Sequence, residues 1–222
     1  MSFALRQVYH NTHTKRALLG TAWRLENRKR LFMEIIVNFL SCQSRDSDRQ
    51  PLHLLDVGGR DGILIRKMNI PCAVTAIDID ADALLKYKLD SPTSTVQIAD
   101  CNENLPFASE SFDIIFAGEI IEHLISPELF LSEIRRVLKP KGLFIGSTPN
   151  AFRYDKRVLL LLGNDPKNFS DPTHTHYFSY ESIQKVLKRH FSSVELECHS
   201  RNRLIKLSSR IFSDGFIWQA KK

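Results

Sequence analysis

The stretch that decides the fold lies between residues 52 and 64 and reads Leu52-His53-Leu54-Leu55-Asp56-Val57-Gly58-Gly59-Arg60-Asp61-Gly62-Ile63-Leu64. Its first half is an apolar run, which is typical of a buried strand in a parallel sheet. A turn rich in glycine follows, and apolar residues from Ile63 to Met68 then predict a short helix. In open α/β sheets this order of elements holds a nucleotide-like ligand, because the missing side chains let backbone N–H groups approach it.

A second apolar run supports this interpretation of the glycine turn. It comprises residues 73–77 and ends in Asp78, twenty residues after Gly58. A carboxylate at about this distance accepts the ribose hydroxyl hydrogen bonds in dinucleotide-binding folds. The turn itself departs from the G-x-G-x-x-G pattern, so its spacing alone is a weak signal and the context carries the prediction.

Several motifs in register then resemble those of class I S-adenosylmethionine (SAM) dependent methyltransferases, most of all the type 11 or ubiquinone-pathway-like branch. The resemblance is close over residues 50–150. The motifs are the glycine turn, Asp78-Ile79-Asp80, Asp100-Cys101, Gly118 to Leu124 and Val137 to Leu143. The resemblance implies that SAM is the cofactor. It also implies a set of cofactor-binding residues: Asp56, Val57, Gly58, Gly59, Arg60, Gly62, Asp78, Ile79, Asp100, Cys101, Gly118 and Glu119.

Individual roles follow from the same resemblance. Asp78 matches the ribose-binding acid, and Asp100 with Cys101 matches the position that binds adenine. The glycine turn departs from the family at one point, because the family's middle glycine falls at Arg60 and Gly59 stands one place earlier. The turn must therefore follow a slightly different path, with Arg60 either near the methionine carboxylate of the cofactor or in solvent.

The fold class is predicted to be α/β. Strand and helix patterns alternate from residue 52 to residue 147, which predicts right-handed crossovers and a parallel sheet. We expect a Rossmann-like, doubly wound sheet of seven strands, mostly parallel with an antiparallel last strand, and helices on both faces. Ser126 and Pro127 begin a helix that continues to Leu138, and Pro140 and Gly142 are expected to end it before a strand at 143–146. Residues 193–198 and 215–219 are expected to be the last two strands, joined as a hairpin.

Two parts of the chain are predicted from the order of these patterns. Residues 1–50, with an amphipathic helix at 27–41, match the N-terminal helical segment that covers the cofactor in related enzymes, where Tyr9 or Arg24 could contact ligand. Residues 51–222 form the methyltransferase domain. Within it, residues 149–178 are interpreted as an insertion on the substrate side, and this insertion includes the basic, apolar stretch Arg153–Leu162.

Composition limits the expected location and binding partners of the protein. No apolar run is long enough to span a membrane, and no secretory signal is visible at the start, so a cytoplasmic location is expected. The four cysteines lack C-x-x-C spacing and are interpreted as reduced thiols. The net charge of +6 is uneven: residues 51–150 are acidic and both flanks are basic. We expect a small-molecule acceptor that is anionic if the basic flanks face it, with nucleic acid as the weaker alternative, and a monomer or homodimer.

Five side chains could carry chemistry. Glu119, Glu122 and His123 follow the fourth strand, and their spacing predicts one helical face; His174 and His176 lie on the insertion. His123, Glu119 and His176 are the predicted catalytic residues, because a neutral imidazole or a carboxylate can take a proton from the acceptor. No metal ligand is assigned. The alternative is a divalent metal held by Glu119, Glu122, His123 and His176, an arrangement that resembles small-RNA 2′-O-methyltransferases, while purely structural roles remain the third interpretation.

The predicted function follows from the cofactor. A methyl sulfonium is already activated, so the protein mainly aligns the acceptor and removes its proton. We expect transfer to an oxygen, or a nitrogen, of a small or medium-sized metabolite by in-line displacement. The alternatives are a metal-assisted RNA 2′-O-methyltransferase and a non-catalytic SAM-binding regulator.

Overall fold

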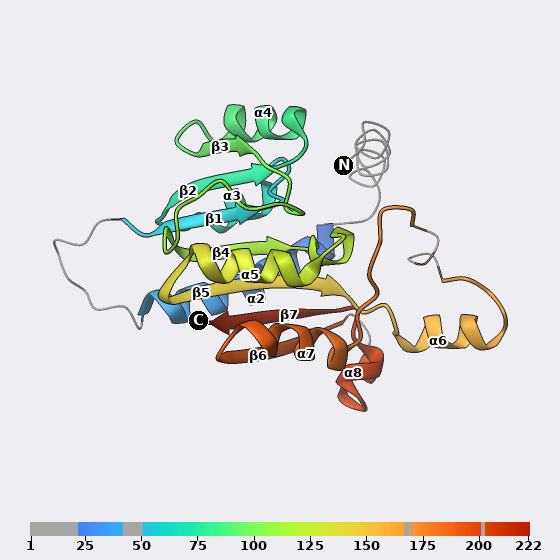
Figure 1. The fold of residues 1–222 in the computed structure, drawn as a ribbon. Coiled ribbons are helices and arrows are strands. Elements are labelled where there is room, and N and C mark those ends of the chain that lie inside the picture. The colour runs from blue at the N-terminus through green and yellow to red at the C-terminus, as the bar shows by residue number, and fades with distance from the viewer. Residues whose placement is uncertain (1–21, 42–50, 167–168, 170, 201–202) are drawn as a thin grey trace.

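A computed structural model of the chain describes residues 22–41, 51–166, 169, 171–200 and 203–222. One sheet of seven strands organises these residues, in the order β3-β2-β1-β4-β5-β7-β6 (Figure 1). Only β7 runs antiparallel to its neighbours within this sheet. The strands are β1 His53–Val57, β2 Ala73–Asp78, β3 Thr95–Ile98, β4 Phe112–Gly118, β5 Leu138–Pro149, β6 Ser193–His199 and β7 Gly215–Lys221. The predicted mostly parallel, seven-stranded sheet with an antiparallel last strand is confirmed.

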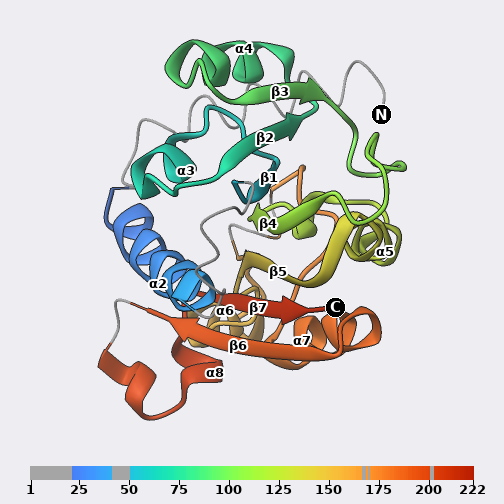
Figure 2. The ribbon, with the colours of Figure 1, turned by 90° about the vertical axis from the view of Figure 1, so that its left-hand side faces the viewer.

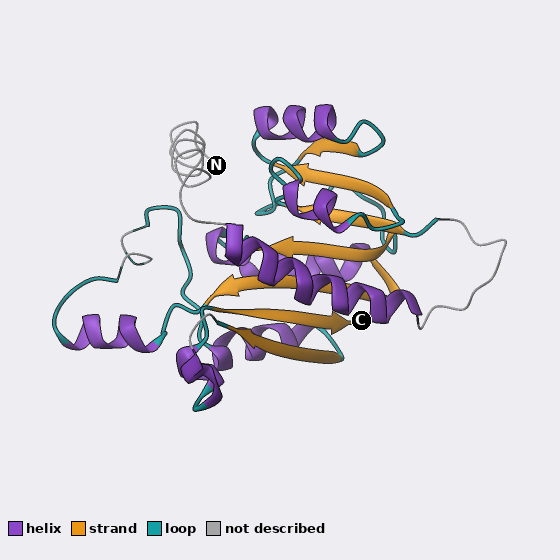
Figure 3. Ribbon diagram, turned by 180° about the vertical axis from the view of Figure 1, so that it is seen from behind, coloured by secondary structure: helices purple, strands orange, loops and turns teal. Residues whose placement is uncertain are grey.

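Helices cover both faces of the sheet, as predicted, because side chains alternate along the central strands. Leu54 and Ile114 pack against one face with α2 (Ala22–Ser41) and α3 (Ile63–Met68). Leu55 and Ile115 point to the other face, where α5 (Pro127–Val137) and α7 (Tyr180–His190) lie. Figure 2 shows the two layers on either side of the sheet, and Figure 3 shows α2 running across its face.

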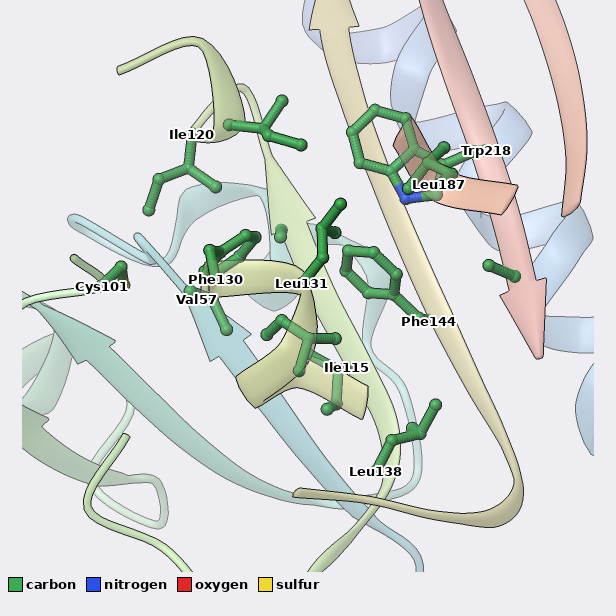
Figure 4. Packing of buried hydrophobic residues seen from close by; sticks show 14 of the residues in the cluster. Val57, Cys101, Ile115, Ile120, Phe130, Leu131, Leu138, Phe144, Leu187 and Trp218 are labelled. Carbon is green, nitrogen blue, oxygen red and sulfur yellow. The ribbon is translucent and has the colours of Figure 1, made fainter. Parts of the chain in front are cut away.

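The larger of the two cores lies under α5 and α7. Phe130 and Leu131 come from α5 and Leu187 from α7, and all three are buried against Ile115 and Phe144 of the sheet (Figure 4). On the other face the amphipathic helix predicted for residues 27–41 is confirmed as part of α2, whose side Phe32-Ile35-Ile36-Phe39 is buried. Side chains of the central strands β1 and β4 contribute to both cores. The glycine turn and the segment from Glu119 to His123 follow the carboxyl ends of these two strands.

The junction between α5 and β5 differs from the sequence-based prediction. Ser126 caps α5 through a hydrogen bond from the Leu129 N–H (3.3 Å) and Pro127 begins it, as expected. The helix ends at Val137, however, and the strand begins at once, so Pro140 and Gly142 lie inside β5. A register shift between Phe112 and Ile114 marks the irregular pairing here. Such a bulge accommodates a proline because the ladder loses its hydrogen bonds there in any case.

The last two strands pair antiparallel but are no tight hairpin. β7 lies between β5 and β6, and the chain between β6 and β7 includes η2 (Arg203–Lys206) and α8 (Ser209–Phe212). The insertion after β5 also contains a helix, α6 (Tyr154–Leu161), which stands apart from the sheet in Figures 1 and 3. α4 (Ala81–Asp90) completes the described helices. In the part of the chain that the structure describes, no helix has both the length and the apolar character needed to cross a membrane.

Candidate active site

The glycine turn lies at the carboxyl end of β1, where two glycines are required. Gly58 and Gly62 have positive φ angles of 67° and 66°, which L side chains rarely adopt. A Cβ atom on Gly58 would lie 2.7 Å from Cδ1 of Ile120, and one on Gly62 would lie 2.5 Å from the Tyr87 ring. The turn is tied to β2 because the N–H groups of Gly58 and Gly59 both donate to the carbonyl of Ile77 (2.9 and 3.2 Å).

Asp78 binds the glycine turn through a backbone N–H group. The carboxylate is buried at the end of β2; one oxygen accepts the Arg60 N–H (3.0 Å) and the other accepts the Asp80 N–H (2.9 Å). Burial raises the pKa of Asp78, and these two hydrogen bonds counteract the increase. Arg60 itself has a φ of 46°, so a non-glycine residue takes the left-handed conformation at the place of the family's middle glycine.

Asp56 packs against the glycine turn. Its carboxylate is buried and accepts a hydrogen bond from the Tyr87 hydroxyl (3.1 Å). Burial raises its pKa to about 7, and repulsion from Asp78 and Asp61 raises it further while the Tyr87 hydrogen bond lowers it. A Cβ atom on Gly59 would lie 2.8 Å from this carboxylate, so Gly59 leaves room for the buried acid.

The predicted adenine-binding loop follows β3. Asp100 accepts two hydrogen bonds from Asn102, from the backbone N–H and from the side-chain amide (2.9 Å each). Cys101 is buried, and burial raises the pKa of its thiol. The Asn102 side chain in turn accepts the Ile125 N–H (2.7 Å), so this loop is joined to the loop that follows β4.

The segment after β4 contradicts one prediction. Glu119 has a φ of 55° and its N–H donates to the carbonyl of Ser147 (2.9 Å), so the chain turns here before the short helix η1 (Ile121–His123) begins. Glu119 therefore does not share a helical face with Glu122 and His123. Its carboxylate pairs with Arg28 of α2 instead. A left-handed residue interrupts the helical periodicity on which the prediction depended.

Glu122 is a buried acid that follows β4. Its side chain is only 3% exposed, and one oxygen accepts the Thr148 hydroxyl (3.1 Å). Burial raises its pKa to about 8, with repulsion from Glu119 as the next cause. Its backbone carbonyl accepts the N–H groups of Thr175 and His176 (2.9 and 3.0 Å), which fastens the insertion against η1.

Two histidines lie beside this acid. Nδ1 of His123 lies 2.9 Å from the carbonyl of Thr173, and the ring centroids of His123 and His174 are 4.7 Å apart. One possible ligand atom each from Glu122, His123 and His174 lie within 4.8 Å of one another. His174 also faces the Asp171 carboxylate, with 3.7 Å between Nε2 and Oδ2.

His176 lies elsewhere. Its Nε2 is 3.3 Å from the carbonyl of Ile125, and its ring stacks on Phe178. Of the two histidines on the insertion, the structure thus brings His174 to His123. The residues between 173 and 178 adopt no helix or strand, so no periodicity could have chosen between them. Thr148, Tyr87 and Arg28 were not identified from the sequence, because each reaches the site from a distant element and none belongs to a motif. Tyr9 lies outside the described residues, as does the Arg24 side chain.

Comparison with known proteins gives a family match to the central part of the chain. A family model described as a methyltransferase domain matches residues 55–146. These residues run from β1 to β5 and include the glycine turn, Asp78, Asp100 and the segment from Gly118 to His123. The match therefore covers the elements that carry most of the candidate site residues.

Curated relatives extend this match. A ubiquinone biosynthesis O-methyltransferase of Glaesserella parasuis serovar 5 (strain SH0165) is 30% identical over 158 residues, which is 65% of this chain and 65% of that protein. Its namesake in Rickettsia bellii (strain OSU 85-389) is 26% identical over 166 residues, 70% of this chain and 66% of that protein. The matched stretch therefore spans just under two thirds of these relatives' length.

A solved structure has a similar fold over the whole chain. The SAM-dependent methyltransferase from Thermotoga maritima aligns with a TM-score of 0.66 and covers 98% of this chain and 99% of its own, at 14% sequence identity. At this identity the likeness concerns the fold alone.

Proposed function

Since the chain belongs to the class I SAM-dependent methyltransferases, we propose that it transfers a methyl group from SAM to an oxygen of a small or medium-sized acceptor. The choice of oxygen is supported by the names of the curated relatives, which are O-methyltransferases. The observation that carries the proposal is the cluster of buried Glu122 with the partly buried His123 and His174, which follows the carboxyl end of β4. An oxygen acceptor must lose a proton as it attacks the sulfonium methyl, and these are the groups that can take it.

His123 is the proposed general base. The Thr173 carbonyl can only accept a hydrogen bond, so the contact with Nδ1 favours the tautomer with its proton on that atom. Nε2 is then the ring nitrogen that can accept the acceptor's proton. Glu122 in its ionised form would stabilise the imidazolium, so this support should grow as the pH rises towards about 8, the pKa of the buried acid. Glu119 and His176, the other two predicted catalytic residues, are assigned to positioning: Glu119 through Arg28, and His176 through its contacts with the loop after η1.

The cofactor residues are proposed as the family pattern has them. Asp78 would accept the ribose hydroxyls with lone pairs that remain beside its two amide hydrogen bonds, since each carboxylate oxygen has room for two. Asp100 and Cys101 would border the adenine. The glycine turn would face the methionine part of SAM, where missing side chains permit a close approach of the backbone. The N–H groups of Gly58, Gly59 and Arg60 already donate to Ile77 and Asp78, so they would shape this surface and not bind the cofactor directly.

A two-step experiment tests the proposal. Calorimetric titration with S-adenosylhomocysteine measures cofactor binding, and a radiolabelled methyl donor with a panel of phenols, catechols and amines measures transfer. We expect label in oxygen acceptors, a large fall in kcat for His123→Gln, and an unchanged cofactor Kd for that variant. The control is His190→Gln, which changes a surface histidine that faces Glu128.

Three results would contradict this assignment. Cofactor binding without transfer to any acceptor would favour the non-catalytic regulator. Label confined to amines would exclude the oxygen acceptor while leaving the family membership intact. Equal losses for His123→Gln and His190→Gln would show that the fall in kcat does not report on a base.

A metal-assisted reaction is the second candidate, and one observation favours it. Two imidazoles and one carboxylate are a set that binds first-row divalent cations with coordination positions left for a substrate. Glu122, His123 and His174 are such a set, although ligands about 2.1 Å from a metal lie roughly 3 Å apart, so the side chains would have to close inward. A cation here would lower the pKa of an acceptor hydroxyl. Neither Glu119 nor His176, which the sequence placed among the metal ligands, belongs to this cluster.

The metal-assisted candidate predicts that methyl transfer requires Mn²⁺ or Zn²⁺ and stops with a chelator. Short RNA with a free terminal diol belongs in the acceptor panel, because such a diol could occupy two coordination positions. His174→Gln should abolish metal binding while His176→Gln retains it. Full activity in the presence of a strong chelator would exclude this candidate.

A further inference from the structure

The exposed apolar residues are concentrated on two segments of the described chain. Of the sixteen large hydrophobic residues that are exposed, nine lie in residues 154–162 or 204–211. We call eight of them the leucine surface: Val158, Leu159, Leu160, Leu161, Leu162, Leu204, Leu207 and Ile211. α6 has no buried residue at all, and Leu161 is 86% exposed. A single exposed leucine needs no explanation, but exposed apolar residues concentrated in two neighbouring segments mark a surface that binds something apolar.

The two segments are held together at their bases. The Tyr154 ring packs against the Phe212 ring, with 5.0 Å between centroids. The Asn150 side chain donates to the carbonyls of Arg210 (3.0 Å) and Ser213 (3.2 Å), and Arg153 pairs with Asp214. α6 and α8 lie on the same side of the molecule in Figures 1 and 3. The two segments that carry the leucine surface are therefore in contact at their bases and lie at the same end of the sheet, although they are distant in sequence.

Basic residues surround these leucines. Residues 153–162 contain three basic residues and one acidic residue, and residues 203–211 contain three basic residues and no acidic one. Arg157 and Lys206 are exposed, and the Arg210 side chain is 60% exposed. Apolar side chains with Lys and Arg beside them are the composition of segments that lie in the interface of an anionic bilayer.

We propose that the leucine surface docks on an anionic lipid membrane. Leu161 and Leu162, at the end of α6, would enter the boundary between headgroups and acyl chains, and Arg157, Lys206 and Arg210 would meet the phosphates. The charge argues against a second copy as the occupant, because two such surfaces would place like charges opposite each other. The docking is peripheral, by an element far too short to span the bilayer.

The position of the leucine surface gives membrane docking a role in acceptor access. β5 passes Thr148, which contacts Glu122, and leads within a few residues to α6. A lipid-soluble acceptor could then reach the crevice from the bilayer without crossing water. This use rests on the proposed function, whereas the docking itself rests on the leucine surface alone.

Co-sedimentation with vesicles tests the proposal. The probes are pure phosphatidylcholine vesicles and vesicles with about 30% phosphatidylglycerol, at low salt and at about 0.5 M salt. We expect the full chain to bind only the anionic vesicles and to weaken with salt. Leu161→Glu should lower this binding about tenfold or more, because it removes apolar insertion and adds repulsion.

The matched control is Leu89→Glu on α4, a leucine that is 71% exposed and distant from the leucine surface. It should bind vesicles like the unaltered chain. Titration with S-adenosylhomocysteine on the same samples shows that each variant is folded and keeps the cofactor site, so a failure of docking is distinguished from a failure of the proposed function.

Three outcomes would overturn the proposal: no binding of the unaltered chain to anionic vesicles, equal loss for Leu161→Glu and Leu89→Glu, or a dimer in lipid-free solution that only Leu161→Glu dissociates. The last would assign the leucine surface to a second copy of the chain.

Discussion

The two halves of the proposed site are built in different ways. In the proposed cofactor half, Asp56, the glycine turn and Asp78 lie within a short stretch of chain, and backbone N–H groups of the turn hydrogen-bond to β2 and to Asp78. In the proposed acceptor half, Glu122, Thr148 and His174 come from η1, β5 and the segment after β5, about 26 residues apart at each step. The first half is a local motif, and the second exists only when distant segments meet. The two should therefore respond differently to substitution.

The largest predicted effect is on stability, at a glycine of the turn that leaves no room for a side chain. Gly62→Ala should lower the free energy of unfolding by about 3 kcal/mol, because it combines an unfavourable positive φ with overlap against the Tyr87 ring. Gly163→Ala is the matched control: its φ is 73°, but nothing lies within 4 Å of the added Cβ, so only about 1 kcal/mol should be lost. Urea unfolding measures both. Equal losses would show that crowding at the turn is unimportant.

The next effect is a pH dependence. The folded-state pKa of Asp56 is raised to about 7 from 3.8, so the folded chain holds a proton between these values that the unfolded chain releases. The contribution of Asp56 to stability is therefore lost as pH rises towards 7. Between pH 5 and 8 the unaltered chain should lose on the order of 2 kcal/mol more than Asp56→Asn does.

Chemical unfolding across this pH range tests the prediction, with Asp82→Asn, an exposed residue of α4, as the control. Parallel pH curves for the unaltered chain and Asp56→Asn would contradict the assigned origin of the shift. If Asp82→Asn flattens the curve to the same extent, the effect belongs to general charge and not to the buried acid.

An effect of similar size should show whether Asp78 binds the cofactor or only supports the turn. Asp78→Ala should weaken S-adenosylhomocysteine binding by about 2 kcal/mol, roughly 30-fold, because charge-assisted hydrogen bonds to the ribose are lost. Calorimetric titration measures the change, and Asp82→Ala should leave the Kd unchanged. An unaltered Kd in Asp78→Ala would limit Asp78 to holding the Arg60 amide.

The smallest effect on the cofactor is expected from the acceptor half. His174→Gln should change the S-adenosylhomocysteine Kd by less than about twofold, yet lower kcat roughly tenfold or more, because its partners are His123 and Glu122 and not the turn. Titration and a methyl-transfer assay on one preparation compare the two values. A large loss of cofactor affinity would abolish the distinction between the halves.

The strand, glycine turn and helix of the proposed cofactor half could be predicted because their information is local. Glycines at fixed offsets, an apolar run before them and Asp78 at the end of the next strand depend on backbone conformation within a few turns of chain. The same locality placed α5 and the cap at Ser126, since a capping side chain acts on its own first turn. At Pro140 and Gly142 the sequence predicted a break between helix and strand. Pairing with β4 instead places both residues inside β5.

By itself the sequence determined the sheet, its two helical layers and the glycine turn after β1, because apolar runs must be buried between layers and a turn with positive φ angles requires glycine. Tertiary structure alone decided that Glu119 turns away to Arg28, that His174 and not His176 meets His123, and that the leucines of α6 remain uncovered. Each of these depends on which segments come to lie side by side across the sheet edge. Residue spacing within one segment does not determine which distant segments come into contact.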